Sequence, residues 1–105
     1  MPVDRLEILK NMVAQNPRDA FARYGLAMEL SKSGELEGAV GEFRTLLSHN
    51  PDYAAAYFHG GQTLEKLGRI EDARDMYEKG IDVTSRTGDQ HTRSELQGAL
   101  DLLPI

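Results

Sequence analysis

Apolar side chains recur along this chain every three or four residues, which is the spacing of one face of an α-helix. The spacing is clearest between positions 36 and 49, where the apolar stripe consists of Leu36, Ala39, Val40, Phe43, Leu46 and Leu47. Similar patterns predict further helices over residues 3–15, 20–33, 53–67, 70–85 and 90–103. We therefore expect an all-α fold of about six helices.

Residues typical of helix ends stand beside these patterns. Asp19, Asp52 and Asp89 precede three of the predicted helices, where a carboxylate can accept a hydrogen bond from a free backbone N–H group. Gly34 and Gly68 follow two of the helices and suit the left-handed conformation in which many helices end. The sequence thus predicts three aspartate N-caps and two glycine stops.

The helical pattern repeats with a fixed period. Asn16-Pro17 and Asn50-Pro51 lie 34 residues apart, and the segments that follow them match position by position. The identical pairs are Pro17/Pro51, Ala20/Ala54, Ala22/Ala56, Leu30/Leu64, Lys32/Lys66, Gly34/Gly68, Glu37/Glu71 and Ala39/Ala73. A period of this length indicates a helical repeat protein, in which each unit buries its apolar face against the next.

On these residues the chain resembles a tetratricopeptide repeat protein, whose 34-residue unit is a helix–turn–helix. The first unit matches the family at Leu26, Ala27, Leu30, Gly34, Ala39, Phe43, Leu46 and Pro51, and the second at Tyr57, Gly61, Leu64, Gly68, Ala73 and Tyr77. The departures are Arg23 in place of an aromatic residue, Gly60 in place of leucine, Gly80 in place of alanine and Ser85 in place of the closing proline. The resemblance implies antiparallel helix hairpins stacked into an α-solenoid superhelix.

We interpret residues 1–105 as a single domain of this kind. Its parts are an N-terminal half-repeat helix (3–16), repeat 1 (17–50), repeat 2 (51–84) and a C-terminal capping helix (89–103). In the half-repeat, Leu6, Leu9, Met12 and Val13 form the predicted apolar face. Arg5 is the equivalent of Ala39 in the 34-residue register. A long side chain is acceptable at this position because the register predicts no helix that would pack against it. We expect the apolar tail at positions 102–105 to fold onto the last helix, with a partner contact as the alternative.

A second face of the first helix in each repeat points away from the predicted helix pair. On this face lie Phe21, Tyr24, Met28, Phe58, His59 and Gln62. The resemblance implies that this face lines a concave groove that receives a peptide, and aromatic and methionine side chains suit such a surface. The alternative for Phe21 and Tyr24 is packing against the N-terminal helix or the neighbouring repeat.

The composition and the motifs of the sequence argue against several other functions. Twelve basic and seventeen acidic residues give a net charge of −5, which argues against a nucleic-acid binder. There is no cysteine, and the three histidines are far apart in the sequence, so we expect no metal site and no cofactor. The sequence contains neither a phosphate-binding loop nor a catalytic motif, so we expect no enzyme. No apolar run approaches the roughly 20 residues of a membrane span. Asp4 and Glu7 stand where a secretion signal needs an uninterrupted apolar core, so we expect a cytoplasmic protein.

The sequence therefore predicts a protein–protein interaction module, a scaffold or adaptor, that binds a peptide segment or partner protein in the groove. One alternative is a structural protein that forms a homo-oligomer through the groove or the C-terminal tail. A remote alternative is a helical-repeat RNA binder, against which the 34-residue period, the acidic balance and the presence of only two repeats all count.

Overall fold

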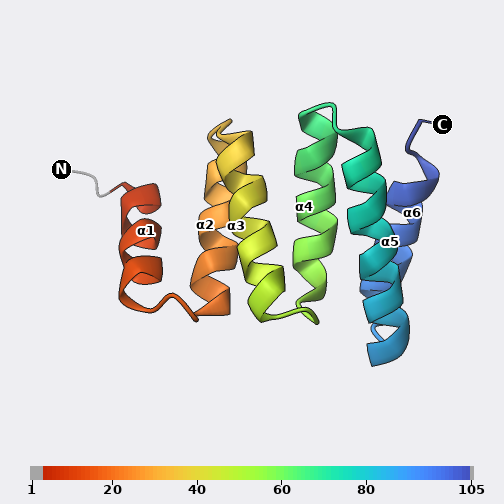
Figure 1. Cartoon of the computed structure of the whole chain (residues 1–105), viewed down its shortest axis with the longest axis horizontal. Helices are drawn as coiled ribbons and strands as arrows, with labels where there is room; N and C mark the ends of the chain where they lie inside the picture. Colours follow the sequence, from red (N-terminus) through yellow and green to blue (C-terminus); the bar gives the residue numbers. More distant parts are fainter. Residues whose placement is uncertain (1–3, 105) are drawn as a thin grey trace.

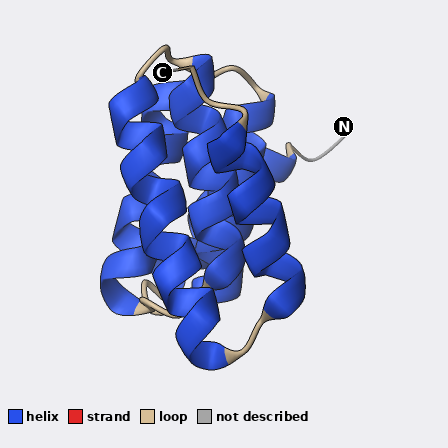
Figure 2. Cartoon of the chain, turned by 90° about the vertical axis from the view of Figure 1, so that its right-hand side faces the viewer, coloured by secondary structure: helices blue, strands red, loops and turns tan. Residues whose placement is uncertain are grey.

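In a computed structural model, which describes residues 4–104, the chain is a row of helices with no strand among those residues (Figure 1). The six helices are α1 (Arg5–Gln15), α2 (Ala20–Lys32), α3 (Leu36–His49), α4 (Ala54–Lys66), α5 (Ile70–Thr87) and α6 (Gln90–Asp101). The molecule measures 45 × 28 × 20 Å, and its connecting loops lie above and below the row, where the individual helices end (Figure 2). The predicted all-α architecture of antiparallel hairpins is confirmed. The division into repeats at 17–50 and 51–84 remains a prediction. Helices α2 and α3 lie inside the first unit and α4 inside the second, whereas α5 begins in the second unit and ends beyond it, at Thr87.

Most of the predicted helix ends are present. The side chains of Asp19 and Asp89 each accept a hydrogen bond, at 3.1 Å, from the backbone N–H three residues later. Gly34 and Gly68 have φ angles of +86° and +76°, the left-handed conformation that glycine adopts at low cost. Local sequence signals therefore place these ends correctly.

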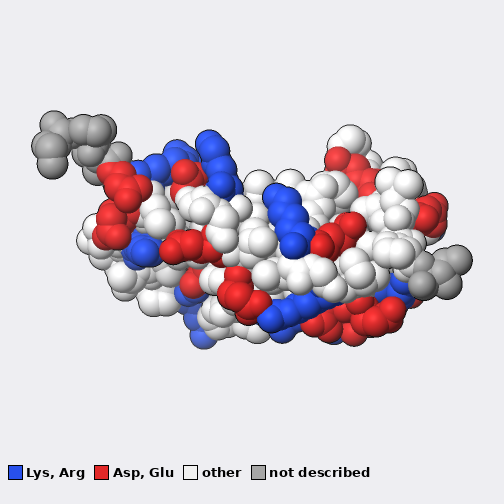
Figure 3. Space-filling model, turned by 90° about the horizontal axis from the view of Figure 1, so that it is seen from above, with Lys and Arg blue, Asp and Glu red and all other residues white. Residues whose placement is uncertain are grey.

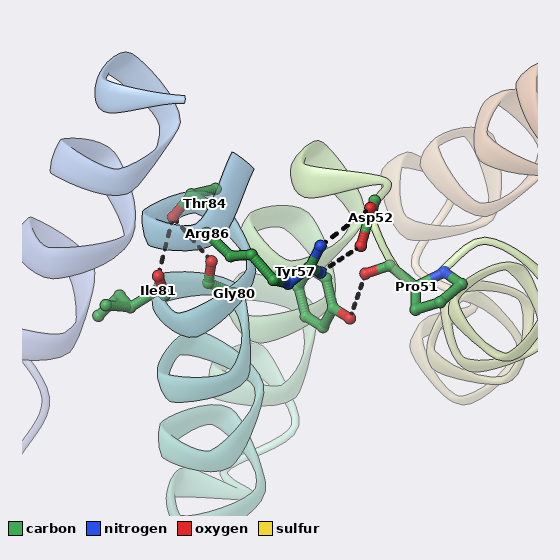
Figure 4. Close-up of polar contacts among 7 residues, drawn as sticks. All are labelled: Pro51, Asp52, Tyr57, Gly80, Ile81, Thr84 and Arg86. Atoms are coloured by element: carbon green, nitrogen blue, oxygen red, sulfur yellow. Dashed lines mark hydrogen bonds and ion pairs between the residues drawn. The ribbon is translucent and has the colours of Figure 1, made fainter. Parts of the chain in front are cut away.

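Asp52 does not cap α4, contrary to the prediction. The N-cap residue is Tyr53, which makes no side-chain capping bond and is the repeat equivalent of Asp19. The carboxylate of Asp52 instead faces Arg86 near the end of α5, with an Nη2–Oδ1 distance of 2.5 Å (Figure 4). Hydrogen bonding to the Arg86 guanidinium holds the pKa of Asp52 below its usual range. Asp52 therefore binds a charged partner near the end of α5 instead of capping α4.

Helix α5 continues past the predicted end at residue 85 to Thr87. Since Ser85 replaces the proline of the earlier repeats, the helix stops only at Gly88, with a φ angle of +81°. Thr84, just before this extension, is fully buried, and its hydroxyl donates to the carbonyl oxygen of Gly80 at 2.8 Å (Figure 4). The extension also carries Arg86 to Asp52, so it ties the end of α5 to the loop before α4.

The first helix differs from the prediction on one face. Leu9 and Val13 are buried, but Met12 is 42% exposed and does not belong to the buried stripe. Position 3, where the predicted helix begins, lies outside the described residues. Arg5 lies on the surface with its Nε atom 3.3 Å from a carboxylate oxygen of Glu29, so it forms an ion pair across α1 and α2.

Arg23, which stands where the family favours an aromatic residue, has a structural role. Its guanidinium lies 2.5 Å from Oε1 of Glu42 on α3 and donates to the carbonyl oxygen of Pro17 at 3.1 Å. The arginine side chain is largely buried, so the pair joins α2 to α3 by charge where an aromatic ring would have done so by packing.

The buried residues form two adjoining clusters. The N-terminal cluster contains Leu9, Val13, Ala22, Leu26, Ala27, Leu30, Ala39, Phe43, Leu46 and Ala56. The C-terminal cluster contains Val40, Tyr57, Leu64, Ala73, Met76, Tyr77, Leu96 and Leu103. Of the tail that was expected to fold onto the last helix, Leu103 lies in the core, and Arg74 donates to the carbonyl oxygen of Pro104 at 2.8 Å. Leu102 is 86% exposed, and Ile105 lies outside the described residues.

Gly41 is a helix-interior glycine that packing does not require. It is exposed on α3, and a Cβ atom added there would meet no atom within 4 Å outside its own helix backbone. We expect Gly41→Ala to raise the free energy of unfolding by about 0.5–1 kcal/mol, because alanine loses less backbone entropy than glycine on entering a helix. Urea unfolding followed by circular dichroism measures this change. A decrease would mean that Gly41 has a close neighbour in solution.

Candidate functional site: a groove lined by α2, α4 and α6

The stack curves toward the layer made by the even-numbered helices. Helix α4 contacts both α2 and α6, whereas among the described residues no Cα atoms of α3 approach those of α1 or α5 within 8 Å. The even-numbered helices are therefore closer together than the odd-numbered ones, and the surface must be concave on their side. Seen from above, one long edge of the molecule is hollowed between its ends (Figure 3).

A row of aromatic rings runs along this side from one repeat to the next. The ring of Tyr24 on α2 lies 5.3 Å from that of Tyr53 and 5.9 Å from that of His59, measured between centroids. Phe58 continues the row, at 5.2 Å from His59 and 6.5 Å from Tyr77. Edge-on and tilted arrangements at these separations are favourable for aromatic pairs. Tyr24, Tyr53, His59 and Phe58 thus form one connected, partly exposed surface across two repeats, and the row ends at the fully buried ring of Tyr77.

The six residues that the sequence predicted to line the groove lie in different environments in the structure. Tyr24, Met28, Phe58 and His59 are half-buried, Gln62 is exposed, and Phe21 is 77% exposed. Packing of Phe21 against the N-terminal helix, the alternative weighed above, is therefore wrong. Tyr24 and Met28 do not point wholly away from the core, as the helical wheel suggested, because both pack on the N-terminal cluster. Phe58 packs in the same way on the C-terminal cluster.

Burial shifts the pKa values of two ring side chains in the row, His59 and Tyr77. Desolvation lowers the pKa of His59, and a hydrogen bond to Gln62 and the charge of Glu95 only partly oppose this effect. Burial also raises the pKa of Tyr77 well above its usual range, as do the hydrogen bond to Glu65 and the charge of that carboxylate. Near pH 7 the groove therefore presents a neutral imidazole, and the Tyr77 hydroxyl remains a donor to Glu65.

A cavity of about 340 Å³ opens where α4 meets α6, and the sequence indicated only part of its lining. The lining residues are Phe58, Gln62, Glu65, Tyr77, Ser94, Glu95, Gly98, Ala99 and Leu102. Phe58 and Gln62 belong to the predicted face, whereas the α6 residues were expected only to cap the last repeat. A signal was present, since Ser94, Gly98 and Leu102 follow one another at intervals of four residues along one side of α6.

A second cleft, of about 360 Å³, opens on the convex side where α3 and α5 diverge. Its lining residues are Arg44, Leu47, Ser48, Tyr57, Asp72, Asp75, Met76 and Lys79. Arg44 and Asp72 already face each other there, with an Nη2–Oδ2 distance of 3.8 Å. The convex cleft is similar in volume but lacks the row of half-exposed rings, so the concave groove is the better candidate for ligand binding.

Residues 4–104 hold no group of three histidine, cysteine or acidic side chains placed to bind a metal ion. His91 lies 3.7 Å from Glu95 one turn later in α6, and the other two histidines are on other helices. Within the described part of the chain, none of the helices has the length and apolar character needed to cross a membrane.

Sequence comparison finds no matching family model. A TPR repeat-containing protein of Pseudomonas aeruginosa is 25% identical over 91 residues, which cover 87% of each chain. An uncharacterised protein of Methanocaldococcus jannaschii is 32% identical over 69 residues, or 66% of this chain and 80% of that protein.

Two solved structures resemble this one closely. The solution structure of a tetratricopeptide repeat domain protein from Salinibacter ruber is 41% identical, with a TM-score of 0.76, and the match covers 81% of this chain and 86% of that one. YrrB, described as a TPR protein with an unusual peptide-binding site, is 28% identical with a TM-score of 0.82. That match covers 92% of this chain and 47% of YrrB.

Proposed function

This chain belongs to the tetratricopeptide repeat family, and from that premise we propose that it binds a peptide segment of a partner protein in its concave groove. The role we assign is a non-enzymatic interaction module. We place the contact surface on Phe21, Tyr24, Met28, Phe58, His59 and Gln62, and extend it across α6 to Gly98 and Leu102. The peptide-binding site described for YrrB supports a peptide as the ligand class.

The observation that carries this proposal is the continuous row of half-buried rings from Tyr24 to Phe58. Aromatic and methionine side chains are enriched in the cores of protein interfaces, where burying their exposed area stabilises the complex. The rings here rest on the two core clusters, so their rotamers are already restricted before a ligand arrives. Binding then costs less side-chain entropy than it would on freely moving residues.

Gly98 offers a direct test, because a Cβ atom added there would meet nothing within 4 Å in a position that faces the cavity. We expect Gly98→Leu to fill the cavity while leaving the helix intact, since leucine is a better helix former than glycine. Peptides selected on the wild-type chain from a random display library should bind this variant more than about tenfold more weakly. Fluorescence polarisation with labelled peptide measures the change.

Gly41→Leu is the matched control. It makes the same chemical change at an exposed glycine of α3 that also has open space around it and does not line the groove. We expect this variant to bind the selected peptides as the wild type does, and circular dichroism should show both variants folded. Equal binding by wild type and Gly98→Leu would overturn the proposed site.

A further inference from the structure

The α4–α6 cavity is lined both by apolar side chains and by two carboxylates, and this combination defines a class of ligand. Resting on the proposed function, we infer that the bound peptide carries an apolar side chain and, within two residues of it, a lysine or arginine. The apolar group would occupy the space over Gly98, and the cation would face the carboxylates of Glu65 and Glu95.

The apolar half of the inference comes from the shape of the cavity. Phe58, Ala99 and Leu102 contribute apolar surface, and Gly98 leaves a gap between them that no side chain fills. A volume of about 340 Å³ is at the small end of ligand sites, which span roughly 300–1,000 Å³. It therefore suits one or two side chains of a peptide and not a folded domain.

The cationic half comes from two carboxylates that pair with no lysine or arginine among the described residues. Glu65 and Glu95 line the cavity, and none of the described side chains that line it is a lysine or arginine. Within residues 4–104, no lysine or arginine nitrogen lies within 4.0 Å of either carboxylate. Glu65 accepts the Tyr77 hydroxyl through Oε2 and keeps Oε1 for another donor. Glu95 lies 3.7 Å from His91, and its charge also acts on the imidazole of His59.

The half-buried position of Glu65 strengthens this preference. A carboxylate held by a fixed donor beside aromatic rings gains more from a cation than a fully solvated one, because the local dielectric constant is lower. In an extended peptide, side chains two residues apart lie on the same side and about 7 Å from each other. An apolar residue and a basic residue at that spacing can therefore enter the same cavity.

The test uses the residue composition of selected peptides. A random peptide library is panned on the full chain, and peptides that also bind Gly98→Leu are discarded, which leaves those that need the cavity. We expect them to be enriched in an apolar residue with lysine or arginine within two positions. For a labelled peptide of this set, Glu95→Gln and Glu65→Gln should each weaken binding roughly three- to tenfold. Glu78→Gln, at an exposed residue of α5 outside the cavity, should leave binding unchanged.

The outcomes separate this inference from the proposed function. Cavity-dependent peptides without basic residues, or ones that bind Glu95→Gln and Glu65→Gln as tightly as the wild type, would overturn the inference and leave the groove as a peptide site. Equal losses for Glu78→Gln would show a general attraction to an acidic protein and would also overturn it. If no selected peptide depends on Gly98, both the inference and the proposed site fail.

Discussion

Replacing Gly61 by alanine should destabilise this protein more than the same change at any of its other glycines. A Cβ atom at position 61 would lie 2.2 Å from Cε1 of Tyr77, a ring that is fully buried. The ring cannot move aside easily, because its hydroxyl is held by Glu65. Overpacking usually costs about 1–3 kcal/mol and occasionally more, and we expect at least 3 kcal/mol at this separation. The melting temperature should fall by more than about 10 °C.

A double-mutant cycle identifies the cause of that loss. If the contact with the Tyr77 ring is responsible, Gly61→Ala should cost much less in a chain that also carries Tyr77→Leu, since leucine lacks the ring atoms that meet the new methyl group. Thermal and urea unfolding of the four chains gives the coupling energy. A free energy of unfolding for Gly61→Ala within about 0.5 kcal/mol of the wild type would contradict this account of the helix approach.

Removing the Leu96 side chain should detach the last helix from the stack. Leu96 is fully buried in the C-terminal cluster, and leucine-to-alanine changes at such sites cost about 2–5 kcal/mol. Each unit of a repeat protein is held mainly by its neighbours, so the loss should be concentrated at α6. Hydrogen exchange should show the amides of α6 opening first in Leu96→Ala. Peptide binding should weaken as well, because α6 forms one wall of the groove.

Leu102→Ala is the control for the same chemical change near the same helix. Leu102 is 86% exposed, so its removal should alter the free energy of unfolding by less than about 0.5 kcal/mol. It lines the cavity, however, and its loss should weaken peptide binding. If Leu96→Ala proved as stable as Leu102→Ala, α6 would not be the packed cap that the structure describes.

Features that depend on neighbouring residues could be predicted from the sequence. The helix of residues 36–49 has the predicted bounds, and the capping by Asp19 and the left-handed turn at Gly34 also agree with the prediction. These features are set by hydrogen bonds and backbone preferences within a few residues, which a single sequence displays directly. The 34-residue period also predicted the order in which the helices stack.

Features that depend on distant residues could not be predicted in this way. Asp52 looked like a cap because it precedes a helix, but Arg86 lies beside it in the fold and binds its carboxylate. Met12 fits the apolar spacing of α1 but lies on a side that no other described helix covers.

The α6 wall of the groove was missed for a related reason. Its Gly98 and Leu102 become part of a cavity only when α6 packs beside α4, and no local pattern records that contact. The sequence therefore predicted only part of the candidate site. The face of α2 and α4 followed from the repeat register, and the face of α6 needed the three-dimensional arrangement.

Backbone amide mapping of a selected peptide tests the central claim most directly. In a ¹⁵N-labelled wild-type chain titrated with a peptide selected on it, the largest chemical-shift changes should fall on α2, α4 and α6, including the amides of Phe58, Gln62 and Gly98. Changes confined to the convex cleft between α3 and α5, around Arg44 and Asp72, would contradict the groove as the binding site.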